Sequence, residues 1–165
     1  MTDKITPCLW YDTGQARAAA EFYVSLGLAD SRINATHTSP ADNPSAPAGA
    51  ELMVEFTLAG RAYLGLNGGS IFPQTEAVSF VIQTGDQAET DRLWNAIVGN
   101  GGQESMCGWC KDRWGVSWQI TPRRLMEFYR DPNPAGTRAA FEAMMTMKKI
   151  DIATLEAAAD AAGQP

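Results

Sequence analysis

Long apolar segments, basic stripes and histidine are all scarce in this 165-residue chain. No apolar run approaches the roughly 20 residues that a membrane-spanning helix needs, so we expect no membrane partner. The opening Met-Thr-Asp-Lys-Ile-Thr-Pro lacks the layout of a signal peptide, which favours a cytoplasmic location. The net charge is −6 and the basic residues form no stripe, so nucleic acid is a poor partner on electrostatic grounds.

Cysteine and histidine are too few to build the common redox and metal sites. Three cysteines cannot all pair within the chain, which fits a reducing compartment. Cys107 and Cys110 have thioredoxin-like spacing, but they fall in an expected strand, not at a helix N-terminus where the dipole lowers a thiol pKa. A zinc half-site would need a second pair of ligands, and the single histidine, His37, lies in an expected loop. We therefore expect reduced, structural thiols at both positions, no metal ligands and no cofactor.

A hydrophobic content of 45% is enough for one domain with a real core, and its elements follow a definite order. A strand is expected over 5–11, and a capping box at Asp12 and Gln15 predicts a helix that stops at Gly27. Further strands are expected over 28–35, 51–58 and 61–67, the last two forming a hairpin across Ala59-Gly60. The long loop over 37–50 is rich in proline and small residues, and loops of this length are usually functional or mobile.

The same order returns in the second part of the chain. A strand is expected over 77–84, a second capping box at Asp86 and Glu89 opens a helix to about Val98, and strands follow over about 104–109 and 116–121. Ser79 lies 71 residues after Cys8, and Leu93-Trp94 lie the same distance after Phe22-Tyr23. A weak internal repeat of this kind implies two stacked copies of one unit.

The segment 107–119 holds three of the five tryptophans and shows what one of these strands does. After the turn over 112–115, Val116, Trp118 and Ile120 point one way, whereas Ser117, Gln119 and Thr121 point the other. A bulky apolar face therefore lies back to back with a small polar one. This is the pattern of a sheet with helices on one side and a ligand cavity on the other.

A doubled βαβββ unit is the plan of the vicinal-oxygen-chelate superfamily, which includes glyoxalase I, extradiol dioxygenases and bleomycin-binding proteins. The motifs resemble its PhnB-like branch, often labelled 3-demethylubiquinone-9 3-methyltransferase. They are Leu9-Trp-Tyr-Asp-Thr-Gly-Gln-Ala16, Phe22-Tyr23, Leu66-Asn-Gly-Gly69, Glu76-Ala-Val-Ser-Phe80, the 87–94 helix, Cys107-Gly-Trp with Gly115-Val-Ser-Trp-Gln119, and Lys148 to Leu155. The resemblance implies an α+β fold in which two βαβββ units (about 1–70 and 71–130) form a cup-shaped mixed sheet with helices outside, followed by a C-terminal helical tail over 131–165.

The resemblance also shows where metal ligands would stand. Metal-using relatives place histidine on the first strand of each half and glutamate on the last. Here Cys8 (or Thr6), Ser79 and Gln119 fall at three of these positions, and the segment 61–67 offers no acid for the fourth. Zinc, nickel and iron need histidine, carboxylate or thiolate donors, so the chain departs from the metalloenzyme pattern at every position.

These positions define the expected ligand pocket, and each of its residues also has a structural interpretation. Cys8 could be a nucleophile or a buried thiol, Gln119 could bind a ligand or a neighbouring group such as Ser79, and Trp10 and Tyr63 could stack on a planar ligand or simply pack. Glu55 is either the only acid of the cup or a solvated side chain on its outer face. The full set of expected pocket residues is Cys8, Trp10, Tyr63, Asn67, Ser79, Ser117 and Gln119.

The sequence therefore predicts a metal-free small-molecule binding protein, or a cryptic enzyme, of the PhnB-like branch. One alternative is a metal-dependent lyase or dioxygenase of the same superfamily with relocated ligands. Another is a drug-sequestering resistance protein of the bleomycin-binding kind. A metal assay distinguishes the metal-dependent enzyme from the other two functions. An aromatic-lined cleft between two subunits would favour the drug-sequestering protein.

The tail suggests self-association. Pro132-Asn-Pro134 breaks the chain, Thr137 could cap a helix to Met147, and Asp151 could cap another that ends near Gly163. Phe141, Met144 and Met145 would share one helical face, and a Met-rich apolar face is more often core or interface than ligand cradle. We therefore expect a homodimer.

Overall fold

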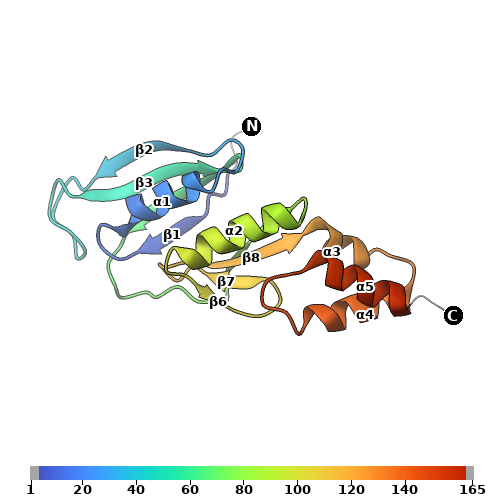
Figure 1. Ribbon diagram of the computed structural model, residues 1–165. Coiled ribbons are helices and arrows are strands. Elements are labelled where there is room, and N and C mark those ends of the chain that lie inside the picture. The colour runs from blue at the N-terminus through green and yellow to red at the C-terminus, as the bar shows by residue number, and fades with distance from the viewer. Residues whose placement is uncertain (1–3, 163–165) are drawn as a thin grey trace. The chain divides into compact units, whose positions relative to one another are not determined.

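Each half of the chain builds a four-stranded sheet with one helix packed against it (Figure 1). The computed structural model describes residues 4–162, and the chain divides into two units, Met1–Gln74 and Thr75–Pro165. The elements of the first unit are β1 (Cys8–Tyr11), α1 (Gln15–Ser25), β2 (Arg32–Thr38), β3 (Glu51–Leu58) and β4 (Arg61–Asn67). Those of the second are β5 (Ser79–Thr84), α2 (Gln87–Gly99), β6 (Gln103–Glu104), β7 (Trp109–Lys111), β8 (Ser117–Pro122), α3 (Arg123–Phe128), α4 (Pro134–Met144) and α5 (Ile152–Ala162). The predicted α+β class and its doubled βαβββ order are confirmed.

The two sheets have the same topology and the same register. Their strand orders are β1-β4-β3-β2 and β5-β8-β7-β6, with the first strand parallel to the last and the other neighbours antiparallel. Cys8 pairs with Leu64 where Ser79 pairs with Ser117, and Trp10 pairs with Leu66 where Val81 pairs with Gln119. Leu66 is therefore the first-unit counterpart of Gln119.

In the first unit, α1 covers the face of the sheet that carries the aromatic residues. Phe56 and Tyr63 stack with ring centroids 5.3 Å apart, and the hydroxyls of Tyr11 and Tyr23 lie 3.0 Å apart. Gly65 allows the close approach of this helix, because a Cβ there would lie 3.3 Å from the Cβ of Ala16. Burying each such large side chain stabilises the fold by about 1.5–3 kcal/mol.

In the second unit, Trp118 and Ile120 of β8 are buried on the side of α2, as the alternation predicts. The turn before β8 is organised by Asp112, whose carboxylate accepts hydrogen bonds from the backbone N–H of Val116 and from the Trp118 indole at 2.9 Å. The sheet consequently has a firmly fixed apolar face, and its opposite face carries the polar side chains.

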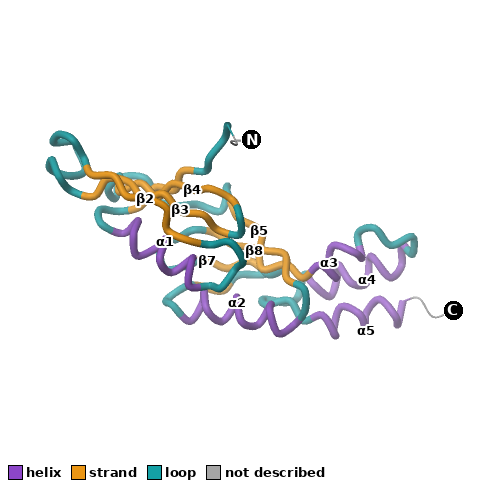
Figure 2. Tube along the Cα trace, turned by 90° about the horizontal axis from the view of Figure 1, so that it is seen from above, coloured by secondary structure: helices purple, strands orange, loops and turns teal. Residues whose placement is uncertain are grey.

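The C-terminal helices pack on one another and join the second unit (Figure 2). The backbone N–H groups of Cys107 and Gly108 donate to the carbonyls of Met147 and Lys148, both at 2.7 Å. The Gln87 side chain donates to the carbonyl of Ile150 and accepts from the N–H of Ile152. The tail is thus attached through backbone hydrogen bonds as well as through apolar contacts.

Several helix starts differ from those expected. The Asp12 capping box is wrong: Gly14 precedes α1 with no side-chain cap, and the Asn67 side chain accepts from the N–H of Ala16 instead. The box at Asp86 is confirmed, since its carboxylate accepts from the N–H of Glu89 at 2.8 Å. In the tail, α4 begins at Pro134 after an Asn133 cap and not at Thr137, because proline at the first helical position needs no N–H partner.

Two strand predictions and one loop prediction also need correction. β2 extends to Thr38, so His37 lies in a strand and not in the long loop. The strand expected over 104–109 is interrupted by a turn, with Cys107 and Gly108 both at positive φ. Asp151 caps α5 as expected, with its carboxylate accepting from the N–H of Thr154. The expected end of this helix near Gly163 lies outside the described residues.

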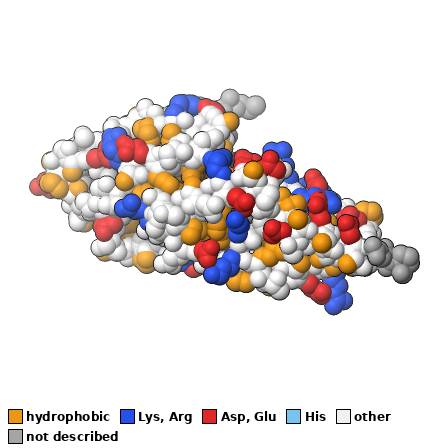
Figure 3. Space-filling model, viewed as in Figure 1, with side chains coloured by type: hydrophobic (Ala, Val, Ile, Leu, Met, Phe, Trp, Pro, Cys, Tyr) orange, Lys and Arg blue, Asp and Glu red, His pale blue; other side chains and the backbone are white. Residues whose placement is uncertain are grey.

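Charged side chains of both signs are interspersed on the face of the molecule shown in Figure 3. Many of them are paired, as in Arg17–Glu51 at 2.5 Å and Lys149–Asp91 at 2.6 Å. Within residues 4–162, no helix is both long enough and apolar enough to cross a membrane.

Candidate functional site

The polar side chains of the second unit gather on the face of its sheet opposite α2, which we call the helix-free face. Ser79, Ser117, Gln119 and Lys111 all belong to it by strand alternation and register. The Gln119 amide donates to the Ser79 hydroxyl at 2.9 Å, which is the bond expected from the structural interpretation of Gln119. It also brings two expected pocket residues together. An accepting hydroxyl keeps its own proton for a further partner.

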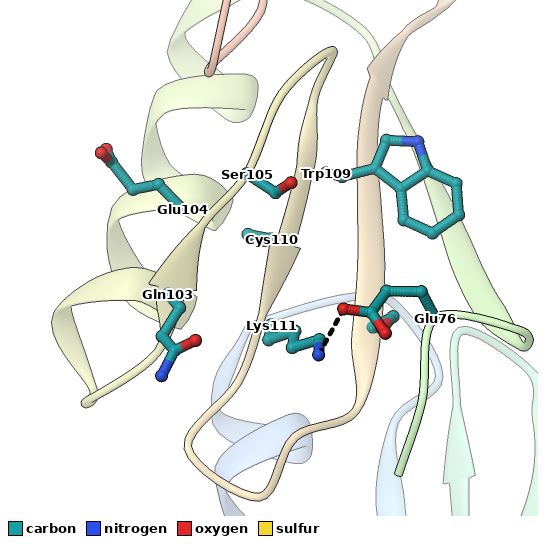
Figure 4. A pocket seen from close by; sticks show the side chains of 8 residues that line it. Glu76, Gln103, Glu104, Ser105, Trp109, Cys110 and Lys111 are labelled. Atoms are coloured by element: carbon teal, nitrogen blue, oxygen red, sulfur yellow. Dashed lines mark ion pairs between the residues drawn. The ribbon is translucent and has the colours of Figure 1, made fainter.

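A cavity of about 150 Å³ lies where this face meets the β6–β7 hairpin. Its lining includes Glu76, Ser105, Trp109, Lys111 and Ser117. Figure 4 shows the Lys111 side chain meeting Glu76, with the indole of Trp109 on the same side of β7 as Glu76. The Nζ to Oε1 distance is 2.5 Å, and this contact lowers the pKa of the Glu76 carboxyl.

The Ser117 hydroxyl is the unusual atom of this cavity. Its residue is 1% exposed, and its Oγ finds no hydrogen-bond partner within the described part of the chain. A buried polar group without a partner destabilises a fold by about 1–3 kcal/mol, and native structures hold few of them. Because this atom is itself almost inaccessible, a ligand in the cavity can supply the missing bond once a neighbouring side chain moves aside.

The Cys110 thiol, which lines the cavity, has low reactivity. Cys110 is 1% exposed, and burial, together with the nearby Asp112 charge, raises its pKa to about 12. Since the thiolate is the reactive form, this thiol is a poor nucleophile near neutral pH. Cys8, Cys107 and Cys110 are all free thiols.

The expected pocket residues of the first unit separate onto the two faces of its sheet. Cys8 and Trp10 lie opposite α1, whereas Tyr63 and Asn67 lie on the covered face. Trp10 is held by local contacts: its indole N–H donates to the Gly69 carbonyl at 2.6 Å, and its ring meets Phe72 edge-on. Partial burial raises the pKa of the Cys8 thiol.

Asn67 has a clear structural role. It is fully buried, and its side chain bridges the N–H of Ala16 at 2.9 Å and the carbonyl of Glu51 at 3.0 Å. Tyr63 stacks on Phe56 within the core. These contacts give both residues roles in packing, so we leave them out of the candidate site.

His37 and Glu55 form a pair that the sequence did not predict. His37 Nε2 lies 2.7 Å from Glu55 Oε1, across neighbouring strands β2 and β3. By register Glu55 pairs with Leu64, which places it on the same face as Cys8. The alternation of 51–58 alone could have placed Glu55, but the misplaced end of β2 hid its partner.

The resemblance places metal ligands at Cys8 (or Thr6), Ser79, Gln119 and a position on the segment 61–67, and the strand register gives Leu66 as the counterpart of Gln119 on that segment. A thiol with a raised pKa, an alkyl group, a hydroxyl and an amide do not fit zinc, nickel or iron. Over residues 4–162, no group of three or more histidine, cysteine, aspartate or glutamate side chains is arranged to hold a metal ion.

Comparison with known families decides the kinship of this chain. A family model described as 3-demethylubiquinone-9 3-methyltransferase matches residues 3–121. The chain belongs to this family. The PhnB-like resemblance is thereby confirmed, although the match ends before the segment 148–155, whose resemblance stays a prediction.

Solved structures agree with this membership. The PhnB protein of Bacillus cereus, described as a 3-demethylubiquinone-9 3-methyltransferase, is 26% identical with a TM-score of 0.64, over 73% of this chain and 99% of that one. Protein PA1353 from Pseudomonas aeruginosa is 20% identical with a TM-score of 0.57, over 73% and 98% of the two chains, and shows the fold alone. Comparison with curated proteins finds no match.

Sequence reasoning named Ser79, Ser117 and Gln119 but missed Lys111, Glu76 and Trp109. Trp109 and Lys111 flank the buried Cys110, so a strict alternation around that cysteine was the available signal. This alternation was missed because the strand expected over about 104–109 ended at Trp109, where β7 in fact begins. Glu76 stands in one of the family motifs, but it precedes β5 in an irregular segment, where strand alternation does not place its side chain.

Proposed function

We propose that this chain binds a small organic molecule, without a metal ion, on the helix-free face of the second unit. The observation that carries this proposal is the buried Ser117 hydroxyl, which belongs to the lining of a cavity on this face and has no hydrogen-bond partner within the described residues. Two positions at which the resemblance places metal ligands, Ser79 and Gln119, carry neutral groups that bond each other. Ser79 is paired across the sheet with Ser117, which lines the cavity. Polar groups placed at the edge of an apolar wall are what orient a ligand in a pocket.

The cavity limits the size of what can bind. Its volume of about 150 Å³ is smaller than the roughly 300–1,000 Å³ of pockets for drug-sized ligands. It therefore suits a small molecule, or one end of a longer molecule that continues along the face past Gln119.

Two other functions compete with this proposal. A metal-dependent lyase or dioxygenase with relocated ligands needs at least three suitable donors, and the His37–Glu55 pair supplies two. A drug-sequestering protein of the bleomycin-binding kind would use an aromatic cleft between two subunits. Either one predicts a binding site that does not depend on Gln119.

The first test is the metal and ligand content of protein purified without an affinity tag. Elemental analysis should find no stoichiometric transition metal, and native mass spectrometry of the gently purified protein should find an organic molecule bound. The bound molecule, added back at about 100 times its Kd, should stabilise the fold by about 2.7 kcal/mol.

The second test separates the site from the rest of the face. Gln119→Leu should weaken binding by at least about tenfold, because a ligand hydrogen bond worth about 1.4 kcal/mol is lost. Gln83→Leu is the matched control, since Gln83 is an exposed amide on the same face of the neighbouring strand β5. A stoichiometric metal that disappears in Gln119→Leu, or binding that this change leaves intact, would refute the proposal.

A further inference from the structure

The cavity beside Lys111 is lined by several hydrogen-bond donors and by two acids, Glu76 and Glu104. The Lys111 ammonium, the unpartnered Ser117 hydroxyl and the Ser79 hydroxyl all stand on the helix-free face. Lys111 and Ser117 are directly paired across β7 and β8, and Ser117 and Ser79 across β8 and β5. Three donors in consecutive cross-strand positions form a row that suits an anion.

The neighbouring acids are engaged elsewhere. The Glu104 carboxylate is bonded to Lys148 at 2.9 Å and points away from Lys111 (Figure 4). The Asp112 carboxylate is committed to the turn and to the Trp118 indole. Glu76 is therefore the acid that meets Lys111, and it does so from outside the strands.

The Glu76 carboxylate is well placed to be displaced from Lys111 by a ligand. Its side chain is 65% exposed, against 29% for that of Lys111, and its backbone belongs to the irregular segment before β5. An ion pair this exposed holds its partners weakly, since water and salt compete with it. The carboxylate can leave without breaking a sheet hydrogen bond, whereas Lys111 and Ser117 are fixed by their strands.

We propose that this cavity binds the carboxylate of a small organic acid at Lys111 and Ser117, and that Glu76 is an internal competitor which the ligand displaces. The inference rests on the proposed function and names the chemical class of its ligand. The Glu76 carboxylate already pairs with the Lys111 ammonium, which shows that a carboxylate fits at this position. One ammonium balances one negative charge, and the flat Trp109 indole gives the rest of the acid a surface to stack on.

Benzoate is a suitable probe because it joins one carboxylate to one flat ring, and benzamide is its neutral counterpart. Binding is followed by amide chemical-shift changes in isotope-labelled protein. Benzoate should shift the signals of residues 76, 111 and 117, and benzamide should bind at least about tenfold more weakly because it lacks the charge-assisted bond.

Three variants then separate the roles. Glu76→Gln should tighten benzoate binding by up to about fivefold, the strength of an exposed ion pair expressed as an affinity ratio. Lys111→Met should weaken it by at least about tenfold. Ser117→Ala should also weaken it while raising the melting temperature of the ligand-free protein, because the unpartnered hydroxyl is removed. Glu21→Gln, an exposed and paired acid of the first unit, is the control and should change nothing.

The outcomes distinguish this inference from the proposed function. Equal binding of benzoate and benzamide, no effect of Lys111→Met, or no benzoate binding to Glu76→Gln would overturn the carboxylate site. The proposed function would survive any of these results if the co-purifying molecule still depended on Gln119. Phenyl phosphate that binds far more tightly than benzoate would also overturn the assignment, since the site would then select a dianion.

Discussion

Asn67 and Gln119 are both amides on the last strand of the sheet in their unit, yet their surroundings give them different roles. Asn67 is fully buried and satisfies two backbone groups, one of them at the start of α1. The Gln119 amide nitrogen donates to another side chain, Ser79, and not to the backbone. The sequence placed both residues in a pocket because local rules see residue type and alternation, and a cap that arrives from 51 residues away is invisible to them.

The three thiols should differ sharply in reactivity. In native protein, a thiol reagent at pH 8 should reach the exposed Cys8, although slowly because partial burial raises the pKa of its thiol, and should leave the buried Cys110 untouched. A raised pKa keeps a thiol neutral, so Cys110, with a pKa of about 12, should stay unreactive up to about pH 10. The double variant Cys8→Ser, Cys107→Ser isolates this residue for measurement.

Unfolding supplies the control for that measurement. In denaturant the Cys110 pKa returns to about 8.5, and the thiol should react fully. Wild-type protein denatured without reductant should yield three thiols, as the free cysteines of the structure require. Recovery of a single thiol would mean that Cys107 and Cys110 are oxidised to a disulfide in the purified protein.

At the scale of elements, the ends of a helix or strand were predicted correctly where contacts between sequence neighbours set them. They were missed where contacts from distant parts of the chain set them. The bounds of both strands of the β3–β4 hairpin were predicted to the residue. The alternation of the strands and the Ala59-Gly60 turn, whose two residues both have positive φ, are local signals. The β6–β7 turn was missed because Cys107 is held at positive φ by hydrogen bonds that its N–H and that of Gly108 make to the tail. A tertiary contact there overrides the strand propensity of the apolar sequence.

Gln87 should be a key residue for docking of the tail. It joins the start of α2 to the start of α5 through the carbonyl of Ile150 and the N–H of Ile152. Gln87→Ala should lower the free energy of unfolding by about 1–3 kcal/mol, because two partly buried backbone groups lose their partner. Urea denaturation followed by tryptophan fluorescence measures this loss.

The exposed amide Gln103, changed to alanine, is the control for this experiment and should cost less than about 0.5 kcal/mol. Hydrogen exchange gives a second readout. In Gln87→Ala the amides of α5 should exchange faster, while those of the β3–β4 hairpin in the other unit should not. Equal stability of the two variants would show that the tail is held by its apolar contacts alone.

At the scale of the whole molecule, the exposed apolar residues of the tail favour a homodimer. Met144 and Ala140 of α4 are buried, while Phe141, Met145 and nearby Tyr129 remain 42–51% exposed. Sedimentation at micromolar concentration should therefore give about twice the 17.8 kDa mass of the chain. Phe141→Glu combined with Met145→Glu should produce a monomer, and Arg138→Gln on the same helix should not. A wild-type monomer would contradict the dimer and leave this patch as ordinary surface.

The final prediction concerns the activity named in the description of the family. A methyl donor such as S-adenosylmethionine is usually bound at the carboxyl ends of a doubly wound parallel sheet, after a glycine-rich turn. Each sheet here has one parallel pair, β1–β4 or β5–β8, and its other neighbours are antiparallel. The first strand leads into Asp12-Thr-Gly-Gln15, and Gly68 is closed off because a Cβ there would strike the Trp10 ring at 2.3 Å.

We therefore expect calorimetry to show no binding of S-adenosylmethionine up to about millimolar concentration, the weak end of useful affinity. The acid that binds beside Lys111 serves as the positive control for the same protein sample. Because a fold alone does not determine an activity, only a measurement of donor binding or methyl transfer can contradict this expectation. Micromolar affinity for the donor would contradict this prediction, and methyl transfer to a demethylated quinone would in addition show that the protein catalyses a reaction.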